Sequence, residues 1–152
     1  MILYLLRHGE AENRGVSDNA RQLTPAGHRH NLAVAMQWAQ RQPDVTAALV
    51  SPYVRAQQTS VDIQQVLPGL QFQDWALITP DTDPHAVLDA LASRSDESVL
   101  LVSHNPLLSN LANLLLDGAY TDRIILGTSN LVCLEFSELA IGCGELRYTL
   151  SP

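Results

Sequence analysis

Short apolar runs recur along this chain, and most are followed by a longer segment with helical spacing. Residues 1–6, 47–50 and 99–102 are almost entirely apolar and are too short for helices of ordinary length. Continuous runs of this kind are typical of strands that are buried on both faces, as in a parallel sheet. Residues 70–75 are expected to form a further strand. The pattern therefore predicts four strands before the last third of the chain.

Four helices are expected to alternate with these strands, and each begins at a polar residue followed by proline. The pairs are Thr24-Pro25, Ser51-Pro52, Asp83-Pro84 and Asn105-Pro106. The polar side chain can accept a hydrogen bond from a free amide of the first turn, and proline fits the first helical position. The first helix is expected to end near residues 42–43, the second before residue 68 and the fourth at residues 117–118.

The order of these elements predicts an α/β fold. Strands that alternate with helices are typical of right-handed crossovers around a parallel core sheet. Residues 131–136 and 144–150 are strand-like and are joined by a turn with glycine, so we expect a hairpin there. Residues 120–130 show no pattern that assigns them to an element. We expect a three-layer sandwich with a mostly parallel central sheet, helices on both faces and an antiparallel C-terminal strand, in a single domain over residues 1–152.

Charge and composition narrow the range of partners. Hydrophobic residues make up 46% of the 152 residues, and the formal net charge is −7. Nucleic acids and anionic membranes bind basic faces, so neither is expected as a partner. Cys133 and Cys143 lie outside any metal-ligand motif and are expected to be small buried side chains in neighbouring strands. No apolar run has the length of a membrane span, and residues 1–6 are too short for a signal-peptide core, so we expect a soluble cytoplasmic protein.

Polar residues of one chemical kind follow three of the apolar runs. Arg7, His8 and Gly9 follow the first run, Arg55 lies one helical turn after the second, and His104 follows residues 99–102. In a parallel sheet these ends share one edge, where open α/β sheets bind their ligands. Gly9 has no side chain, which would let the backbone turn sharply and approach a bound anion as part of a substrate site. We therefore expect two arginines and two histidines to converge.

These side chains point to a phosphoryl group as the ligand. Arginine offers a planar, permanently charged fork that matches phosphate oxygens, and helix N-termini add free amides. One neutral imidazole can attack phosphorus while a second donates a hydrogen bond to the phosphoryl oxygens. A metal site is the competing use of two histidines. However, no carboxylate or cysteine joins them at ligand spacing, and two arginines would repel a cation, so we expect neither a metal nor another cofactor.

The motifs resemble those of the histidine phosphatase (phosphoglycerate mutase-like) superfamily, and within it the SixA-type phosphohistidine phosphatases most of all. The likeness begins with Arg7-His8-Gly9-Glu10 after an apolar strand. It continues through Ser17-Asp18, Arg21, Leu23-Thr24, Gly27, Ser51-Pro52, Arg55-Ala56, Gln58-Thr59, Val102-Ser103-His104 and Pro106. The first tripeptide alone is a weak motif, whereas the ordered set at these separations is specific.

The resemblance implies a role for each matching residue. His8 would be the nucleophile and would form a phosphohistidine intermediate. Arg7, Arg55 and His104 would bind the phosphoryl oxygens. Arg21 would line the pocket, as in the SixA-type branch, although a solvated charge on a loop is a fair alternative.

The chain departs from the family pattern at the proton donor. Acid-phosphatase members have an aspartate directly after the second histidine, where this chain has Asn105. Mutase and sugar-phosphatase members use a glutamate in the middle of the chain, for which Asp81 is the nearest candidate here. General acid catalysis is typically worth roughly 10²–10⁴-fold, and an alkoxide leaving group needs it far more than an imidazole does. The missing acid favours phosphohistidine on a protein, such as a histidine phosphotransfer domain, as the substrate.

Two alternatives to a protein phosphohistidine phosphatase stay open. The first is a small-molecule phosphomonoesterase or mutase of the same superfamily, with Asp81 as the acid. The second is a catalytically idle adaptor that binds phosphate, because folds can outlive their functions. The intact set of Arg7, His8, Arg55 and His104 argues against the second alternative.

Overall fold

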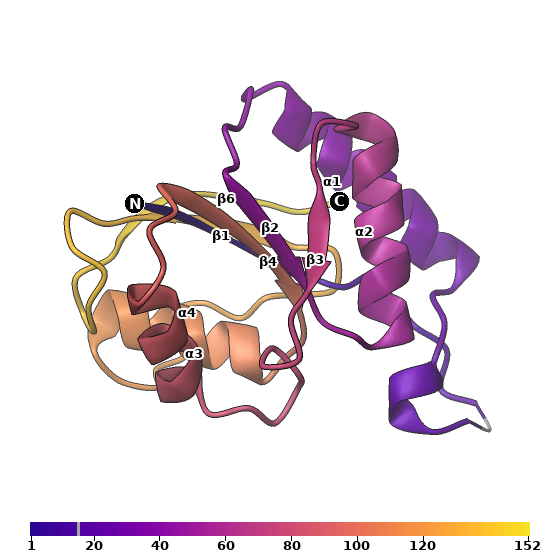
Figure 1. The fold of residues 1–152 in the computed structure, drawn as a ribbon. Helices are drawn as coiled ribbons and strands as arrows, with labels where there is room; N and C mark the ends of the chain where they lie inside the picture. The colour runs from indigo at the N-terminus through magenta and orange to yellow at the C-terminus, as the bar shows by residue number, and fades with distance from the viewer. Residues whose placement is uncertain (15) are drawn as a thin grey trace.

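A six-stranded sheet forms the middle layer of the molecule (Figure 1). The structure is a computed structural model that describes residues 1–14 and 16–152. Over these residues the strands lie in the order β3, β2, β4, β1, β5, β6. Their bounds are β1 (Ile2–Arg7), β2 (Ala47–Val50), β3 (Phe72–Asp74), β4 (Ser98–Ser103), β5 (Leu131–Glu135) and β6 (Glu145–Leu150). Each strand corresponds to one predicted from the sequence, with small differences at the ends.

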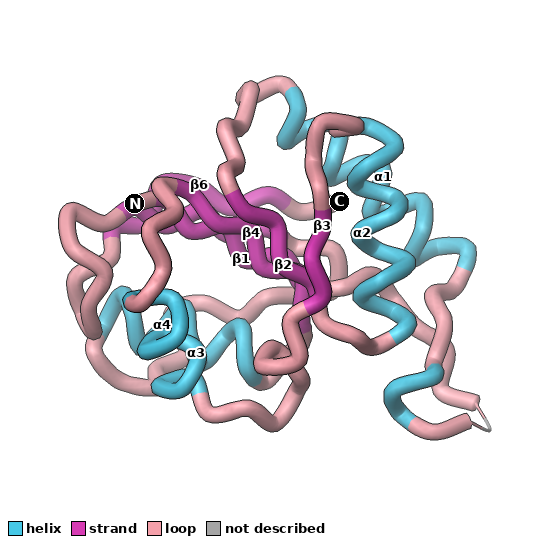
Figure 2. Tube along the Cα trace, viewed as in Figure 1, coloured by secondary structure: helices cyan, strands magenta, loops and turns pink. Residues whose placement is uncertain are grey.

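Within the described residues, four α-helices cover the two faces of the sheet in pairs (Figure 2). Helices α1 (Pro25–Ala39) and α2 (Val54–Val66) lie on one face. Helices α3 (Pro84–Ala92) and α4 (Leu107–Asp117) lie on the other. A short 3₁₀ helix, η1 (Asp18–Ala20), interrupts the loop between β1 and α1. The three-layer α/β fold expected from the sequence is confirmed.

The apolar run of β1 separates two hydrophobic cores. Leu3 and Leu5 pack with α3 and α4, whereas Tyr4 and Leu6 pack with α1 and α2. Side chains alternate between the two faces of a strand, so a strand covered on both sides must be apolar at every position. The burial of all four residues explains why this run shows no alternation with polar residues.

The direction of the strands changes at β5. Strand β1 pairs in parallel with β4 and antiparallel with β5, and β6 pairs antiparallel with β5. The first four strands are therefore mutually parallel, and their carboxyl ends share one edge. The predicted hairpin of β5 and β6 is present, and Gly142 in its connection has a φ of 70°, in the left-handed region that glycine adopts readily.

Two of the four predicted helix caps are present and two are not. Thr24 Oγ1 accepts a hydrogen bond from the Gly27 amide at 3.0 Å, and the Asp83 carboxylate accepts one from the His85 amide at 2.9 Å. Ser51 and Asn105 lie before the cap positions of α2 and α4. The prediction of four identical caps was therefore wrong. Asn105 Oδ1 still accepts from the Ser109 amide in the first turn of α4 at 3.2 Å, whereas the Ser51 hydroxyl is bound to His104.

The two cysteines differ in burial. Cys133 is buried in β5, as expected, whereas Cys143 is exposed and precedes β6, so the expectation of two buried thiols was wrong for Cys143. Cys143 lies in a turn outside the layered core, where side chains need not be buried. No helix in the described part of the chain combines the length and apolar character needed to cross a bilayer. The cytoplasmic location stays a prediction.

Candidate active site

The sheet brings the predicted residues together at the carboxyl ends of its parallel strands. Arg7 pairs with Ser103 across β1 and β4, so that His8 and His104 each follow one member of this pair. The His8 amide donates to the Ser103 carbonyl at 3.0 Å, which extends the pairing by one residue. The centres of the His8 and His104 rings lie 5.1 Å apart. Two histidines that are 96 positions apart in the sequence thus become neighbours.

His8 is held with one ring nitrogen free to react. Its Nδ1 lies 2.7 Å from the Gly9 carbonyl oxygen, which can only accept, so Nδ1 carries the proton. Its Nε2 then has a lone pair and accepts a hydrogen bond from Arg55 Nε at 3.1 Å. The side chain is buried. An imidazole with this tautomer can attack phosphorus through Nε2.

The surroundings of His8 keep its ring neutral. Burial lowers the pKa of His8 most, and Arg55, Arg7 and Arg21 lower it further, against the opposing effect of the Gly9 carbonyl. The resulting pKa is about 3, well below the usual value near 6.5. His8 is therefore a neutral imidazole over the physiological pH range, with a lone pair on Nε2.

Arg55 lies in the first turn of α2 and is 3% exposed. Besides His8, its guanidinium binds Asp18 twice, with Nη1 donating to the carbonyl oxygen at 2.6 Å and Nη2 paired with Oδ2 at 3.3 Å. Burial lowers the pKa of Arg55, and Asp18 opposes this effect. Asp18 thus fixes the fork of Arg55 beside His8. The sequence placed Asp18 in a family motif but gave it no role.

Arg21 lies at the rim of the site rather than against His8. Its Nε pairs with Asp18 Oδ1 at 3.0 Å, and its Nη1 donates to Asn13 Oδ1 at 2.8 Å. Asp18 therefore links Arg21 to Arg55. The charge of Arg21 also lowers the pKa of His8, so this arginine acts on the site electrostatically in the conformation described. Its direct contact with a substrate stays a prediction.

Arg7 and His104 each present a buried nitrogen without a partner. Arg7 Nη1 donates to the Leu126 carbonyl at 3.0 Å, but its Nε makes no hydrogen bond. His104 Nδ1 is the second such atom, and within the described residues only Trp38 Nε1 shares this property. Buried polar atoms are nearly always paired, so unpaired ones call for an explanation. The oxygens of a phosphoryl group would accept from both Arg7 and His104.

His104 is the most enclosed residue of the set, with 0% exposure. Its Nε2 lies 2.7 Å from Ser51 Oγ, and the Tyr53 ring packs edge-on against it with 4.9 Å between ring centres. Burial lowers the pKa of His104 most, and His8 and the three arginines lower it further, to about 2. His104 is therefore neutral and can act only as a neutral donor or acceptor.

Gly9 is required for space rather than for a turn. A Cβ at this position would lie 2.8 Å from Asn31 Oδ1 and 2.9 Å from the Gly27 carbonyl, both on α1. Gly9 does not adopt a left-handed conformation. Its amide donates to Thr59 Oγ1 on α2 at 3.0 Å. The glycine thus lets α1 pack against the loop that follows His8, while its contact with a substrate stays a prediction.

A buried polar network between α1 and α2 lies next to this loop. Asn31 donates to Thr59 Oγ1 at 3.3 Å and to Asp62 Oδ2 at 2.9 Å, and His28 Nδ1 lies 2.8 Å from the same carboxylate oxygen. Ser129 Oγ donates to Asn31 Oδ1 at 2.7 Å. The sequence analysis placed Thr59 in a family motif without a role and missed the other residues. The available signal was the presence of polar side chains among the apolar positions of α1 and α2.

The connection that the sequence left unassigned closes the site on the β5 side. The Ser129 amide lies 3.1 Å from the carbonyl oxygens of both Arg7 and His8, and Leu126 accepts from Arg7. Residues 120–130 therefore fix the end of β1. They do so mostly through backbone groups, which leave no pattern in a sequence.

Asp81 is not bonded to the converging residues. It is exposed and makes no hydrogen bond or ion pair with the described residues, so its predicted role as an acid stays a prediction. Across residues 1–14 and 16–152, no group of three histidine, cysteine, aspartate or glutamate side chains is placed to hold a metal ion. The expectation that turnover needs no metal also stays a prediction.

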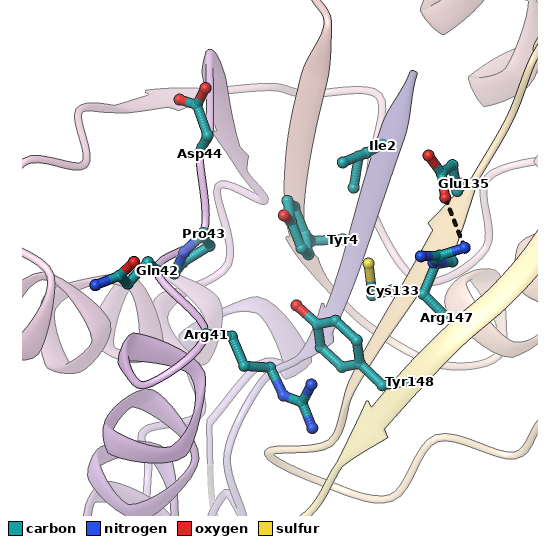
Figure 3. A pocket seen from close by; sticks show the side chains of 10 residues that line it. All are labelled: Ile2, Tyr4, Arg41, Gln42, Pro43, Asp44, Cys133, Glu135, Arg147 and Tyr148. Atoms are coloured by element: carbon teal, nitrogen blue, oxygen red, sulfur yellow. Dashed lines mark ion pairs between the residues drawn. The ribbon is translucent and has the colours of Figure 1, made fainter.

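The largest described cavity lies at the opposite edge of the sheet, at the amino ends of the parallel strands (Figure 3). Its volume is about 610 Å³, and none of the predicted site residues lines it. Its two arginines are already engaged, because Arg147 pairs with Glu135 at 3.1 Å and Arg41 stacks 4.1 Å from the centre of the Tyr148 ring. Cavity size therefore does not mark the site in this molecule, whereas converging charge does.

Comparisons with known proteins point to one family. The model of the histidine phosphatase superfamily (branch 1) matches residues 3–77. A phosphohistidine phosphatase SixA homolog of Haemophilus influenzae is 37% identical over 123 residues, which cover 73% of this chain and 74% of that protein. Phosphohistidine phosphatase SixA of Escherichia coli is 29% identical over 159 aligned residues, which cover 100% of this chain and 94% of that protein. The structure of a protein histidine phosphatase SixA complexed with tungstate has a TM-score of 0.87 and 29% identity, and the match covers 100% of this chain and 97% of that one.

Proposed function

This chain belongs to the histidine phosphatase superfamily, and we propose that it is a phosphohistidine phosphatase of the SixA type with His8 as its nucleophile. The observation that carries the proposal is the state of the His8 ring. Its Nδ1–H is bound to the Gly9 carbonyl, and its unprotonated Nε2 accepts a hydrogen bond from Arg55. A neutral nucleophile beside fixed positive charge is suited to attack on a phosphoryl group.

The reaction follows from this arrangement in two steps. His8 Nε2 forms a bond to phosphorus while the bond from phosphorus to the substrate imidazole breaks, which gives phospho-His8 and a free histidine. Water then attacks phosphorus, the bond to His8 breaks, and the proton of the water leaves with the products. Arg7 and Arg55 hold the phosphoryl oxygens in both steps, because their fixed charges match the charge that develops there.

The side chain that follows the second histidine supports a leaving group that needs no acid. Asn105 donates from Nδ2 to the Leu126 carbonyl at 2.8 Å and accepts at Oδ1 from the Ser109 amide at 3.2 Å. An amide in these contacts has no proton to give to a departing alkoxide. Histidine leaves as a neutral imidazole when its other nitrogen is protonated, so a phosphohistidine substrate fits this site.

A protein is the substrate class that the surroundings favour. A groove of about 430 Å³, lined in part by Asn105, Ser109 and Ile125, adjoins the site through Asn105. Ile125 is 70% exposed, which leaves an apolar contact available at its edge. The named relatives are phosphohistidine phosphatases. We therefore include a phosphohistidine-bearing protein, such as a histidine phosphotransfer domain, in the proposal.

The test compares leaving groups. We expect kcat/KM to be highest for a phosphorylated histidine phosphotransfer domain, lower for an aryl phosphate and lowest for a sugar phosphate. Asp81→Asn should change none of these values much, because a departing imidazole does not need Asp81 as an acid. A preference for the sugar phosphate that Asp81→Asn removes would show a small-molecule phosphatase instead. A chain that binds phosphate but turns over none of the three would be an adaptor.

A further inference from the structure

Ser51 is fixed between β2 and α2 with its hydroxyl directed at His104. Its amide donates to the Val102 carbonyl at 3.0 Å, and its own carbonyl accepts from Gln57 Nε2 at 2.9 Å. The backbone is therefore held on both sides of the side chain. Ser51 is fully buried, and its Oγ lies 2.7 Å from His104 Nε2.

The partners of the Ser51 hydroxyl decide which atom carries the proton in this contact. The Tyr53 amide approaches Ser51 Oγ at 3.3 Å and can only donate, so it uses a lone pair of the oxygen. Within the described residues, the hydroxyl proton has His104 Nε2 as its acceptor. Ser51 thus donates to His104, and Nε2 is the unprotonated nitrogen of that ring.

The charge of His104 completes the assignment of its protons. Burial, the neighbouring His8 and the arginines lower its pKa to about 2, so the ring is not an imidazolium at neutral pH. A neutral ring carries one proton. With Nε2 unprotonated, that proton is on Nδ1, which is the buried atom that lacks a partner.

We propose that Ser51 is a positioning residue that holds His104 as the Nδ1–H tautomer, so that a neutral imidazole donates a hydrogen bond to the phosphoryl oxygens. The proposal rests on the proposed function for the identity of the bound group, but not for the tautomer. It deepens that function, because it explains how a second histidine donates without adding a fourth positive charge beside Arg7, Arg21 and Arg55. Nitrogen protonation in histidine is commonly set by the hydrogen bond at the other nitrogen.

The direct test is the protonation of the His104 ring in the ¹⁵N-labelled full-length protein. Long-range ¹H–¹⁵N correlation distinguishes protonated from unprotonated ring nitrogens, and the His104 signals are assigned by their loss in His104→Gln. At pH 7 we expect Nδ1 to be protonated and Nε2 to be unprotonated. A protonated Nε2 in the wild-type protein would overturn the proposal.

Variants of Ser51 test the consequence for anion binding, with inorganic vanadate as the probe. Ser51→Ala removes the donor, so the share of Nδ1–H should fall and vanadate should bind about tenfold more weakly, as for the loss of one hydrogen bond. Ser51→Cys keeps a weak donor and should give an intermediate result. Vanadate binding equal to the wild type in a folded Ser51→Ala protein would contradict the proposal.

Ser103→Ala is the matched control. Ser103 is also a buried serine at a strand end, but its Oγ donates to the Ile78 carbonyl at 2.8 Å and not to a ring of the site. This variant should lose some stability and keep both the His104 tautomer and the affinity for vanadate. Equal losses in both variants would show a merely structural role for Ser51.

These measurements separate the proposal from the proposed function. The tautomer and the vanadate affinity require no turnover, so they can be as expected even if phosphohistidine proteins are not hydrolysed. Conversely, hydrolysis of a phosphohistidine protein together with the opposite tautomer would leave the function intact and remove the role of Ser51.

Discussion

His8 and His104 are neighbours with the same chemistry, yet they are held by different kinds of partner. Both are buried, and the pKa of each is lowered by burial and by arginines. His8 is fixed by a backbone carbonyl at 2.7 Å, that of Gly9, and this bond leaves Nε2 unprotonated. His104 is bound by a side-chain hydroxyl at the same distance, that of Ser51, and this bond leaves Nδ1 free.

The two histidines therefore differ in how easily a substitution could change their tautomers. No single side-chain substitution removes a backbone carbonyl, so the tautomer of the nucleophile depends on the path of the main chain. The tautomer of His104 depends on one hydroxyl and can be changed by one substitution. In the proposed mechanism, the group that makes and breaks bonds is therefore held by the backbone, while the group that only donates a hydrogen bond is held by a side chain.

Replacing each histidine gives the largest expected difference between them. His8→Ala should abolish turnover, because no other group can form the covalent intermediate. His104→Ala should cost about 10²–10³-fold in kcat, the range for removal of one donor to a developing charge. Turnover with a phosphohistidine protein measures both, and circular dichroism checks the fold. If the folded His8→Ala protein kept activity within tenfold of the wild type, the assignment of His8 as the nucleophile would be wrong.

Arg55 tests whether the His8 side of the site depends on the shape of a guanidinium. Arg55→Ala should lower kcat/KM by about 10²–10³-fold, because it removes donors both to the phosphoryl oxygens and to His8. Arg55→Lys should recover little, since a point charge replaces a planar fork that is held by Asp18. Full recovery with lysine would mean that Arg55 supplies only a positive field.

Thr59 tests whether the hydrogen bond from the Gly9 amide to α2 helps to hold the backbone next to His8. Thr59→Val removes the acceptor of the Gly9 amide and should lower kcat by about tenfold with little change in KM. Ser60→Ala is the control, because Ser60 Oγ is also bonded within α2, to the Gln57 carbonyl at 2.6 Å, but does not touch the loop. Similar kinetics for the two variants would show that the network contributes only to stability.

For both histidines the sequence predicts the strand and the position of the chemistry, but it does not predict the side chain that holds His104. The apolar run of β1 is continuous, and an arginine and a histidine follow it at once, so both the strand and the position of the chemistry can be predicted. The same holds for β4 and His104. These predictions depend on residues that are adjacent in the sequence, where periodicity and spacing carry the information.

The features of the site that the sequence did not predict depend on contacts between residues that lie far apart in the chain. Ser51 was predicted to cap a helix, as a serine before a proline commonly does, but its hydroxyl binds a ring 53 positions away. Asn31 and Asp62 were not singled out, because a buried polar side chain looks like any other polar residue until its partners are known. Leu126 and Ser129 act through backbone groups, which every residue has.

Acid is expected to reveal the likeness of the two histidines through the stability of the fold rather than through turnover. The folded pKa values of His8 and His104, about 3 and about 2, lie below the usual value near 6.5, so the unfolded chain binds more protons than the folded one. The free energy of unfolding should therefore rise with pH between about 4 and 6.5 and fall as the solution is acidified through this range. Each histidine contributes at most one proton, which corresponds to a slope of roughly 1.4 kcal/mol per pH unit.

Urea unfolding across this range should show a smaller slope for His8→Gln and for His104→Gln, by about the same amount in each. A slope unchanged by either substitution would mean that the histidine is not held neutral by its surroundings, whatever its hydrogen-bond partner.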